Sequence, residues 1–200
     1  MYIYKYLMVL AVLILSACST IKSTSTSNFP DSANEQPGIV ELLPKELHNY
    51  SYVGQHNYGG NLGYSLRYAK SSEYKHYADI YIWPAPKEAS EYPHKIVVES
   101  VTEASLGDIY AAQEQGAYDN LALLEGLTYD TDGQILTMHK LSMLKGNLKS
   151  ISYLFVTEYK GNLLKARVTL PDNEANRARE DVQEFVVELI NTIIENIASA

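Results

Sequence analysis

The stretch that decides the fold is NLALLEGLTYDTDGQILTMHKLSMLKGNLKSISYLFVTEYKGNLLKARVTL, residues 120–170. It divides into four segments rich in apolar, β-branched and aromatic residues, at 120–130, 134–144, 148–159 and 163–170. The dipeptides between them are Asp132-Gly133, Gly146-Asn147 and Gly161-Asn162. Such dipeptides readily adopt the positive φ angles of tight hairpin turns. The stretch therefore predicts a four-stranded antiparallel meander.

The region before the meander predicts three further strands and one helix. The strands are expected at 49–58, 62–70 and 76–83; in the second, apolar and aromatic side chains alternate with small or polar ones, which is typical of a half-buried strand. Residues 88–116 then change to a helical period. Gly116 is a suitable end for this helix.

The end of the sequence predicts a second helix, from about residue 174 to residue 197. Its apolar residues recur at helical spacing and are Val182, Phe185, Val186, Leu189, Ile193 and Ile197. Such a stripe serves either as a partner surface or as cover for the chain's own sheet. We expect the second role, because a sheet of this size must bury its apolar face.

The order of three strands, a helix, four strands and a helix predicts an α+β fold, with helices packed against an antiparallel sheet. This order resembles the Mog1/PsbP-like fold. The motifs LGYSLRY, YADIYIW and DIYAAQEQGAYDN also look like patterns in uncharacterised bacterial exported proteins. The resemblance spans residues 45–198 and implies a non-catalytic accessory or binding role. It transfers no functional residue to this sequence.

The N-terminal residues have the pattern of a secretory signal, with Lys5 before an apolar run at 6–14. The run has about half the ~20 residues that a membrane-spanning helix needs. The following tetrapeptide, Leu15 to Cys18, resembles the lipobox of bacterial lipoproteins. This resemblance implies removal of residues 1–17 and attachment of a diacylglyceryl group to Cys18, which anchors the protein in a membrane.

The rest of the chain then consists of a tether and one domain. Residues 18–38 are rich in serine and threonine and show no apolar period, as expected for a tether, and residues 39–200 form a single domain. By the same resemblance to sorted lipoproteins, Ser19 after the cysteine implies the periplasmic face of the outer membrane.

Composition and missing motifs argue against several functions. Cys18 is the only cysteine, so neither a disulfide nor thiol catalysis is expected in the domain. The net charge of −8 is unfavourable for nucleic acid, which we do not expect as a partner. The five histidines show no metal-binding spacing, and Arg67 occupies the last glycine position of a Gly-x-Ser-x-Gly motif. We therefore predict no catalytic residues, no metal site and no cofactor.

The unusual feature of the composition is its seventeen tyrosines, many of which crowd between residues 50 and 81. Tyrosine suits contact surfaces, including stacking on sugar rings, but it also has a high propensity for half-buried strands. In the strand at 76–83, Tyr81 and Trp83 should face away from the isoleucines at 80 and 82. With Arg67, they form the predicted binding surface.

Two functional hypotheses remain. The first is a lipid-anchored, non-catalytic accessory protein that binds an envelope protein or a cell-wall glycan. The alternative is an envelope hydrolase that acts on glycan or peptide through scattered carboxylates and histidines. The absence of a catalytic motif favours the first hypothesis.

Overall fold

The computed structural model describes residues 43–59, 62–70, 76–131, 133–174 and 179–199. Cys18, the expected signal and the expected tether lie outside these residues, as does Asp132 of the first predicted hairpin turn.

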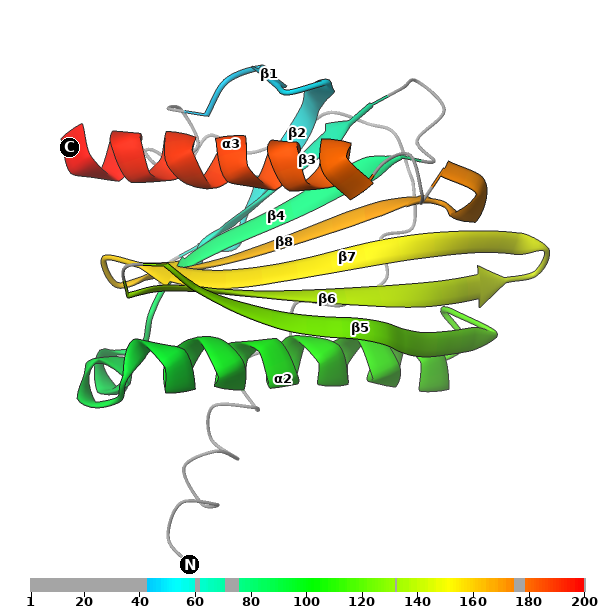
Figure 1. Ribbon diagram of the computed structural model, residues 1–200, viewed down its shortest axis with the longest axis horizontal. Helices are drawn as coiled ribbons and strands as arrows, with labels where there is room; N and C mark the ends of the chain where they lie inside the picture. Colours follow the sequence, from blue (N-terminus) through cyan, green and yellow to red (C-terminus); the bar gives the residue numbers. More distant parts are fainter. Residues whose placement is uncertain (1–42, 60–61, 71–75, 132, 175–178, 200) are drawn as a thin grey trace, which may run out of the picture.

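One antiparallel sheet of eight strands forms the centre of the described domain (Figure 1). The strands are β1 (Glu46–Leu47), β2 (Tyr50–Asn57), β3 (Tyr64–Ala69), β4 (Tyr77–Pro84), β5 (Asn120–Thr131), β6 (Gln134–Lys145), β7 (Leu148–Tyr159) and β8 (Asn162–Pro171). The helices are α2 (His94–Glu114) and α3 (Arg179–Ser199), with short 3-10 turns η3 (Lys87–Glu91) and η4 (Asp172–Glu174). The predicted α+β fold with helices against an antiparallel sheet is confirmed.

The strand order β1-β2-β3-β4-β8-β7-β6-β5 joins two consecutive groups of strands through the pairing of β4 with β8. The meander forms as predicted, and its second hairpin closes between Lys145 and Leu148. The first helix starts later than expected, at His94 rather than at residue 88. Pro93 explains the difference, because the residue before a proline is disfavoured in helical conformation.

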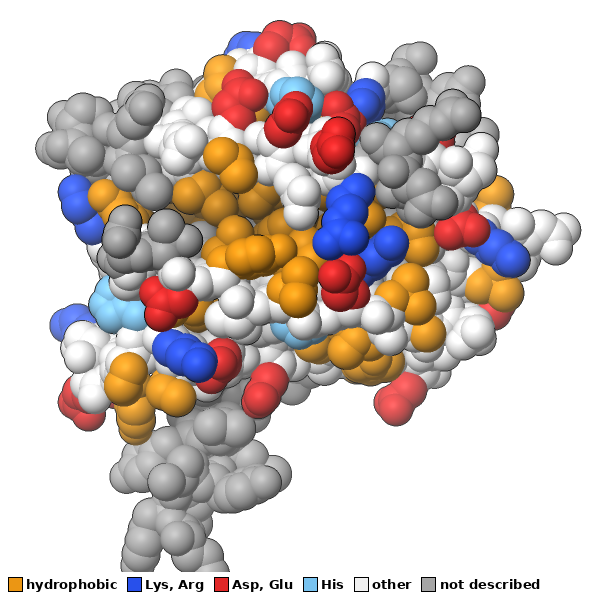
Figure 2. Space-filling model, in the orientation of Figure 1, with side chains coloured by type: hydrophobic (Ala, Val, Ile, Leu, Met, Phe, Trp, Pro, Cys, Tyr) orange, Lys and Arg blue, Asp and Glu red, His pale blue; other side chains and the backbone are white. Residues whose placement is uncertain are grey.

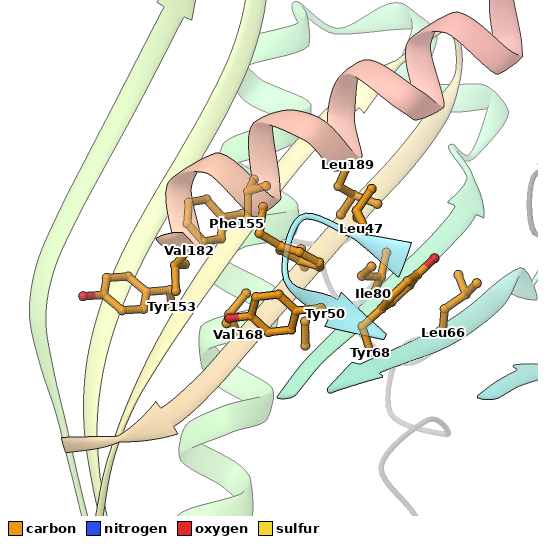
Figure 3. Close-up of a cluster of buried hydrophobic side chains, with 14 of the residues drawn as sticks. Leu47, Tyr50, Leu66, Tyr68, Ile80, Tyr153, Phe155, Val168, Val182 and Leu189 are labelled. Carbon is orange, nitrogen blue, oxygen red and sulfur yellow. The ribbon is translucent and has the colours of Figure 1, made fainter. Parts of the chain in front are cut away.

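The two helices cover opposite faces of the sheet (Figure 1). On one face, α3 packs over a cluster that includes Tyr50, Tyr68, Ile80 and Phe155, which we call the α3 core (Figure 3). On the other face, α2 packs over a second cluster, the α2 core, to which β5, β6, β7 and β8 contribute. β7 is consequently buried on both faces, with an unbroken buried run at 151–158.

The apolar stripe of α3 faces the sheet. Its described members Val182, Phe185, Val186, Leu189 and Ile193 are all buried, whereas Val187 is exposed. The predicted packing role of the stripe is confirmed for these residues. The side chain of Ile197 is not among those that the structure describes. None of the helices described is long and apolar enough to cross a membrane.

Candidate functional site

Part of the sheet face that carries α2 lies beyond that helix. α2 packs mainly on β5, β6 and β7, and no other described α-helix lies on this face. Strand alternation and register bring together the side chains of His56, Ser65, Arg67, Tyr77, Asp79, Tyr81, Lys165 and Arg167 from β2, β3, β4 and β8. We call this surface the Tyr81 face. It includes two of the three residues of the predicted binding surface, Arg67 and Tyr81.

A bidentate ion pair fixes one cation of the Tyr81 face. Arg67 Nε donates to Asp79 Oδ1 at 2.6 Å, and Nη2 donates to Asp79 Oδ2 at 2.8 Å. The guanidinium carbon lies 5.0 Å from the ring centroid of Tyr77, within the range of a cation–π contact. The hydrogen bonds that Arg67 donates to Asp79 raise the pKa of Arg67, and the arginine side chain stays 45% exposed. Arg67 is thus a positioned, solvent-accessible cation.

A second cation lies over the central ring of the face. Lys165 Nζ is 4.6 Å from the ring centroid of Tyr81, its cross-strand partner. Lys165 also interacts electrostatically with Asp108 of α2. Burial raises the pKa of the Asp108 carboxyl, and the positive charge of Lys165 offsets part of this rise. Lys165 and Tyr81 therefore form a half-buried cation–ring pair beside the flank of α2.

A third cation, Arg167, is held by neutral groups. Its Nε donates to Ser152 Oγ at 2.9 Å, and its Nη2 lies 3.0 Å from Tyr118 Oη and 3.0 Å from Met143 Sδ. Its cross-strand partner Asp79 already forms the bidentate pair with Arg67. The face thus has three cations around one carboxylate, with Asp108 at its margin, in a chain whose net charge is −8. This local excess of positive charge suits an anionic ligand.

Trp83, the third residue of the predicted surface, also contacts the α2 core. It lies on the opposite face of β4 from Ile80 and Ile82, as alternation predicted, but its ring is half-buried against the α2 core. A Cβ on Gly63 would lie 2.6 Å from Trp83 Cβ and 2.0 Å from Ile82 O, so only glycine fits beside it. Trp83 thus contributes to the packing of α2, because that helix covers this side of the sheet.

One group of acid–base side chains joins β2, the residue before β4 and the turn η4. Tyr50 Oη is 2.7 Å from His76 Nε2, and His76 Nδ1 is 3.5 Å from Glu174 Oε2. Tyr50 is completely buried, and this burial raises the pKa of its hydroxyl, so the group stays protonated. The arrangement links β2 to the turn η4, and the buried tyrosine is not accessible to a substrate.

Asp181 forms a second polar link at the same end of α3. Its carboxylate accepts hydrogen bonds from Lys70 and Asn49 and lies 2.9 Å from His48 Nε2. Burial alone would raise the pKa of Asp181, but these hydrogen bonds outweigh it and lower the pKa. Among the residues described, no three histidine, cysteine or acidic side chains gather as metal ligands would.

Sequence reasoning missed Lys165 and Arg167, although β8 carries a signal for them. The two basic residues alternate with Leu164, Ala166 and Val168 in LLKARVTL, which places both cations on one face of an otherwise apolar strand. Their proximity to Arg67 and Tyr81 depends on the pairing of β4 with β8, which sequence spacing does not show.

No family model matches the sequence, and no curated protein matches it. The fold is similar to the solution structure of cyanobacterial PsbP (CyanoP) from Synechocystis sp. PCC 6803, with a TM-score of 0.48 and 11% identity over 70% of this chain and 80% of that one. It is also similar to the crystal structure of PA94 from Pseudomonas aeruginosa, a protein of unknown function, with a TM-score of 0.42 and 8% identity over 68% of this chain and 92% of that one. Both likenesses concern the arrangement of helices and strands and carry no argument about function.

Proposed function

We propose that this protein is a non-catalytic, lipid-anchored accessory protein of the cell envelope, which binds a carboxylate-bearing cell-wall glycan through the Tyr81 face. The anchor is the lipid on Cys18, and the location is the periplasmic face of the outer membrane. The observation that carries the proposed binding is the grouping of three cations and two tyrosine rings on a surface that α2 leaves accessible.

The chemistry of the face fits this ligand class in two ways. Tyrosine rings are rigid and apolar with a polar tip, which suits stacking on sugar rings. Arginine and lysine pair with carboxylates, and arginine does so with directional N–H groups. A shallow sheet surface also accepts a long polymer at many points along its length, whereas a closed pocket would take only its end.

Binding of soluble cell-wall glycan fragments to the full chain in detergent tests the proposal. Lys165→Gln removes the cation over Tyr81, and Arg67→Gln removes the exposed guanidinium; we expect each to weaken binding by about tenfold, the effect of a lost charge-assisted hydrogen bond. The matched control is Lys140→Gln, since Lys140 Nζ lies 5.7 Å from the ring of Tyr153 on the opposite face of the sheet.

The salt dependence of binding provides a second measurement. Binding through the cations of the Tyr81 face should weaken as ionic strength rises, because salt screens charges beyond about 8–10 Å. The proposal is wrong if the fragments do not bind, or if Lys140→Gln lowers affinity as much as Lys165→Gln does. Cleavage of the fragments by the wild-type protein would instead favour the hydrolase alternative.

A further inference from the structure

The sheet ends on one side in a long edge strand. β5 has 12 residues and pairs with β6 along its length, and the strand order ends there (Figure 1). In the part of the chain that the structure describes, no segment pairs with the outer side of β5. At about 3.3 Å per residue this edge is roughly 40 Å long. Its outward N–H and C=O groups match those of another extended chain.

The usual protection of an edge strand is largely missing from β5. Natural sheets shield their edges with lysine, proline, short strands or bulges. The sequence of β5, NLALLEGLTYDT, has no lysine and no proline; its protective features are a register shift between Leu123 and Glu125 and the two acidic residues Glu125 and Asp130. The other side of the sheet ends in β1, which has two residues, and Tyr52 N–H donates to Lys45 O there at 2.8 Å.

The exposed side chains of β5 are suited to contact with a partner. Leu123, Leu124 and Tyr129 are 44%, 54% and 41% exposed. Leu127 is half-buried against the α3 core, so apolar surface continues from the edge towards that helix. Figure 2 shows hydrophobic side chains gathered below α3 on the visible side of the molecule. A strand added here would bury apolar surface and also pair backbone groups.

The charge around β5 selects the kind of partner. Glu125 and Asp130 lie on the strand, which has no basic residue, and Glu125 is 3.4 Å from Arg179 of α3. The described residues offer no basic partner to Asp130. The neighbouring helix α2 carries four acidic residues, namely Glu99, Glu103, Asp108 and Glu114, and one lysine. A second copy of this acidic chain would bring like charges to the same edge, which disfavours self-pairing.

We propose that β5 pairs with an extended segment of another protein, in which basic and apolar side chains alternate. The backbone hydrogen bonds of the added strand supply affinity, while the apolar surface and Asp130 select its side chains. This surface is separate from the Tyr81 face, so the protein has one surface for glycan and another for a protein strand.

The probe is a synthetic peptide of about ten residues in which lysine and valine alternate, with both ends capped. The control peptide has the same sequence with the amides of one edge N-methylated, which removes its strand-pairing donors. We expect the unmodified peptide to bind the full chain in detergent and to slow amide hydrogen exchange within residues 120–131. The N-methylated peptide should bind at least about tenfold more weakly.

Two variants of the protein locate the binding edge. Leu124→Lys places a lysine at the register shift of β5, and Asp130→Lys reverses the charge near the C-terminal end of the same strand. Both positions are exposed, so both variants should fold. Each should weaken peptide binding by about tenfold. The matched control is Val53→Lys, since Val53 is a 44% exposed apolar residue at the register shift of β2, near the other end of the sheet.

Several results would overturn the proposal. These are no binding of the peptide, equal binding of the N-methylated peptide, or loss of binding in Val53→Lys but not in the β5 variants. A dimer of the wild-type chain that Leu124→Lys dissociates would show that the occupant is a second copy. Lys165→Gln changes the Tyr81 face and not β5, so it should leave peptide binding unchanged. The strand-pairing proposal and the glycan-binding proposal can therefore fail independently of each other.

Discussion

Replacing Leu189 by alanine tests how α3 is held on the sheet. Leu189 is completely buried in the α3 core, where Figure 3 shows it beside Leu47. The change removes about three methylene equivalents, worth roughly 0.8 kcal/mol each in transfer free energy. A partly relaxed cavity adds about 1 kcal/mol, so we expect the free energy of unfolding to fall by about 3 kcal/mol.

Thermal and urea unfolding of the full chain measure this loss. For a domain of this size, 1 kcal/mol corresponds to about 2–4 °C in Tm, so Leu189→Ala should lower Tm by roughly 6–12 °C. The control is Val187→Ala, because Val187 lies two residues earlier on the same helix and is 54% exposed. It should keep or slightly raise Tm, since alanine has the higher helix propensity. A Tm drop below about 2 °C for Leu189→Ala, or equal drops in both variants, would refute the packing of α3 by this stripe.

The other predictions concern Trp83, the histidines and the anchor. Trp83→Ser should lower the free energy of unfolding by about 2–3 kcal/mol, because it removes a ring packed on the α2 core, whereas Tyr81→Ser should lower it by about 1 kcal/mol. Urea unfolding of the two variants measures both losses. Equal losses would contradict the packing role of Trp83. Burial lowers the pKa of His139 from 6.5, and burial followed by the charge of Lys70 lowers that of His76. The unfolded chain then binds protons more readily than the folded one, so the free energy of unfolding should be highest above pH 6.5 and fall as the pH drops towards the folded-state pKa values. His139→Gln should make the free energy of unfolding depend less on pH. A pH dependence unchanged by this substitution would contradict the prediction. Cys18→Ala should release the protein from membranes or leave its signal uncut. Membrane fractionation and mass spectrometry of the protein from cells measure these two outcomes. If the variant is processed and binds membranes as the wild type does, Cys18 is not lipidated.

Local patterns in the sequence determined most of the secondary structure. Turn dipeptides such as Gly146-Asn147 and Gly161-Asn162 predicted the hairpins of the meander, because their backbone preferences act within a few residues. The helical period predicted that Leu189 and its neighbours face the sheet, since a stripe of this width must be buried. The cysteine after the apolar N-terminal run led to the prediction of a lipid anchor, which depends on no tertiary contact.

Tertiary structure alone decided how the two groups of strands join and which face each helix covers. β4 pairs with β8, whose residues are more than seventy positions away, and this pairing brings Lys165 and Arg167 beside Tyr81 and Asp79. The two helices cover opposite faces, so Trp83 packs against the α2 core, while Tyr81, on the same face of β4, pairs with Lys165 beyond the part that α2 covers. Alternation along a strand states only that two side chains point to opposite faces. Which face is covered, and how far the cover extends, depends on contacts between distant segments, and the sequence has no local pattern for these.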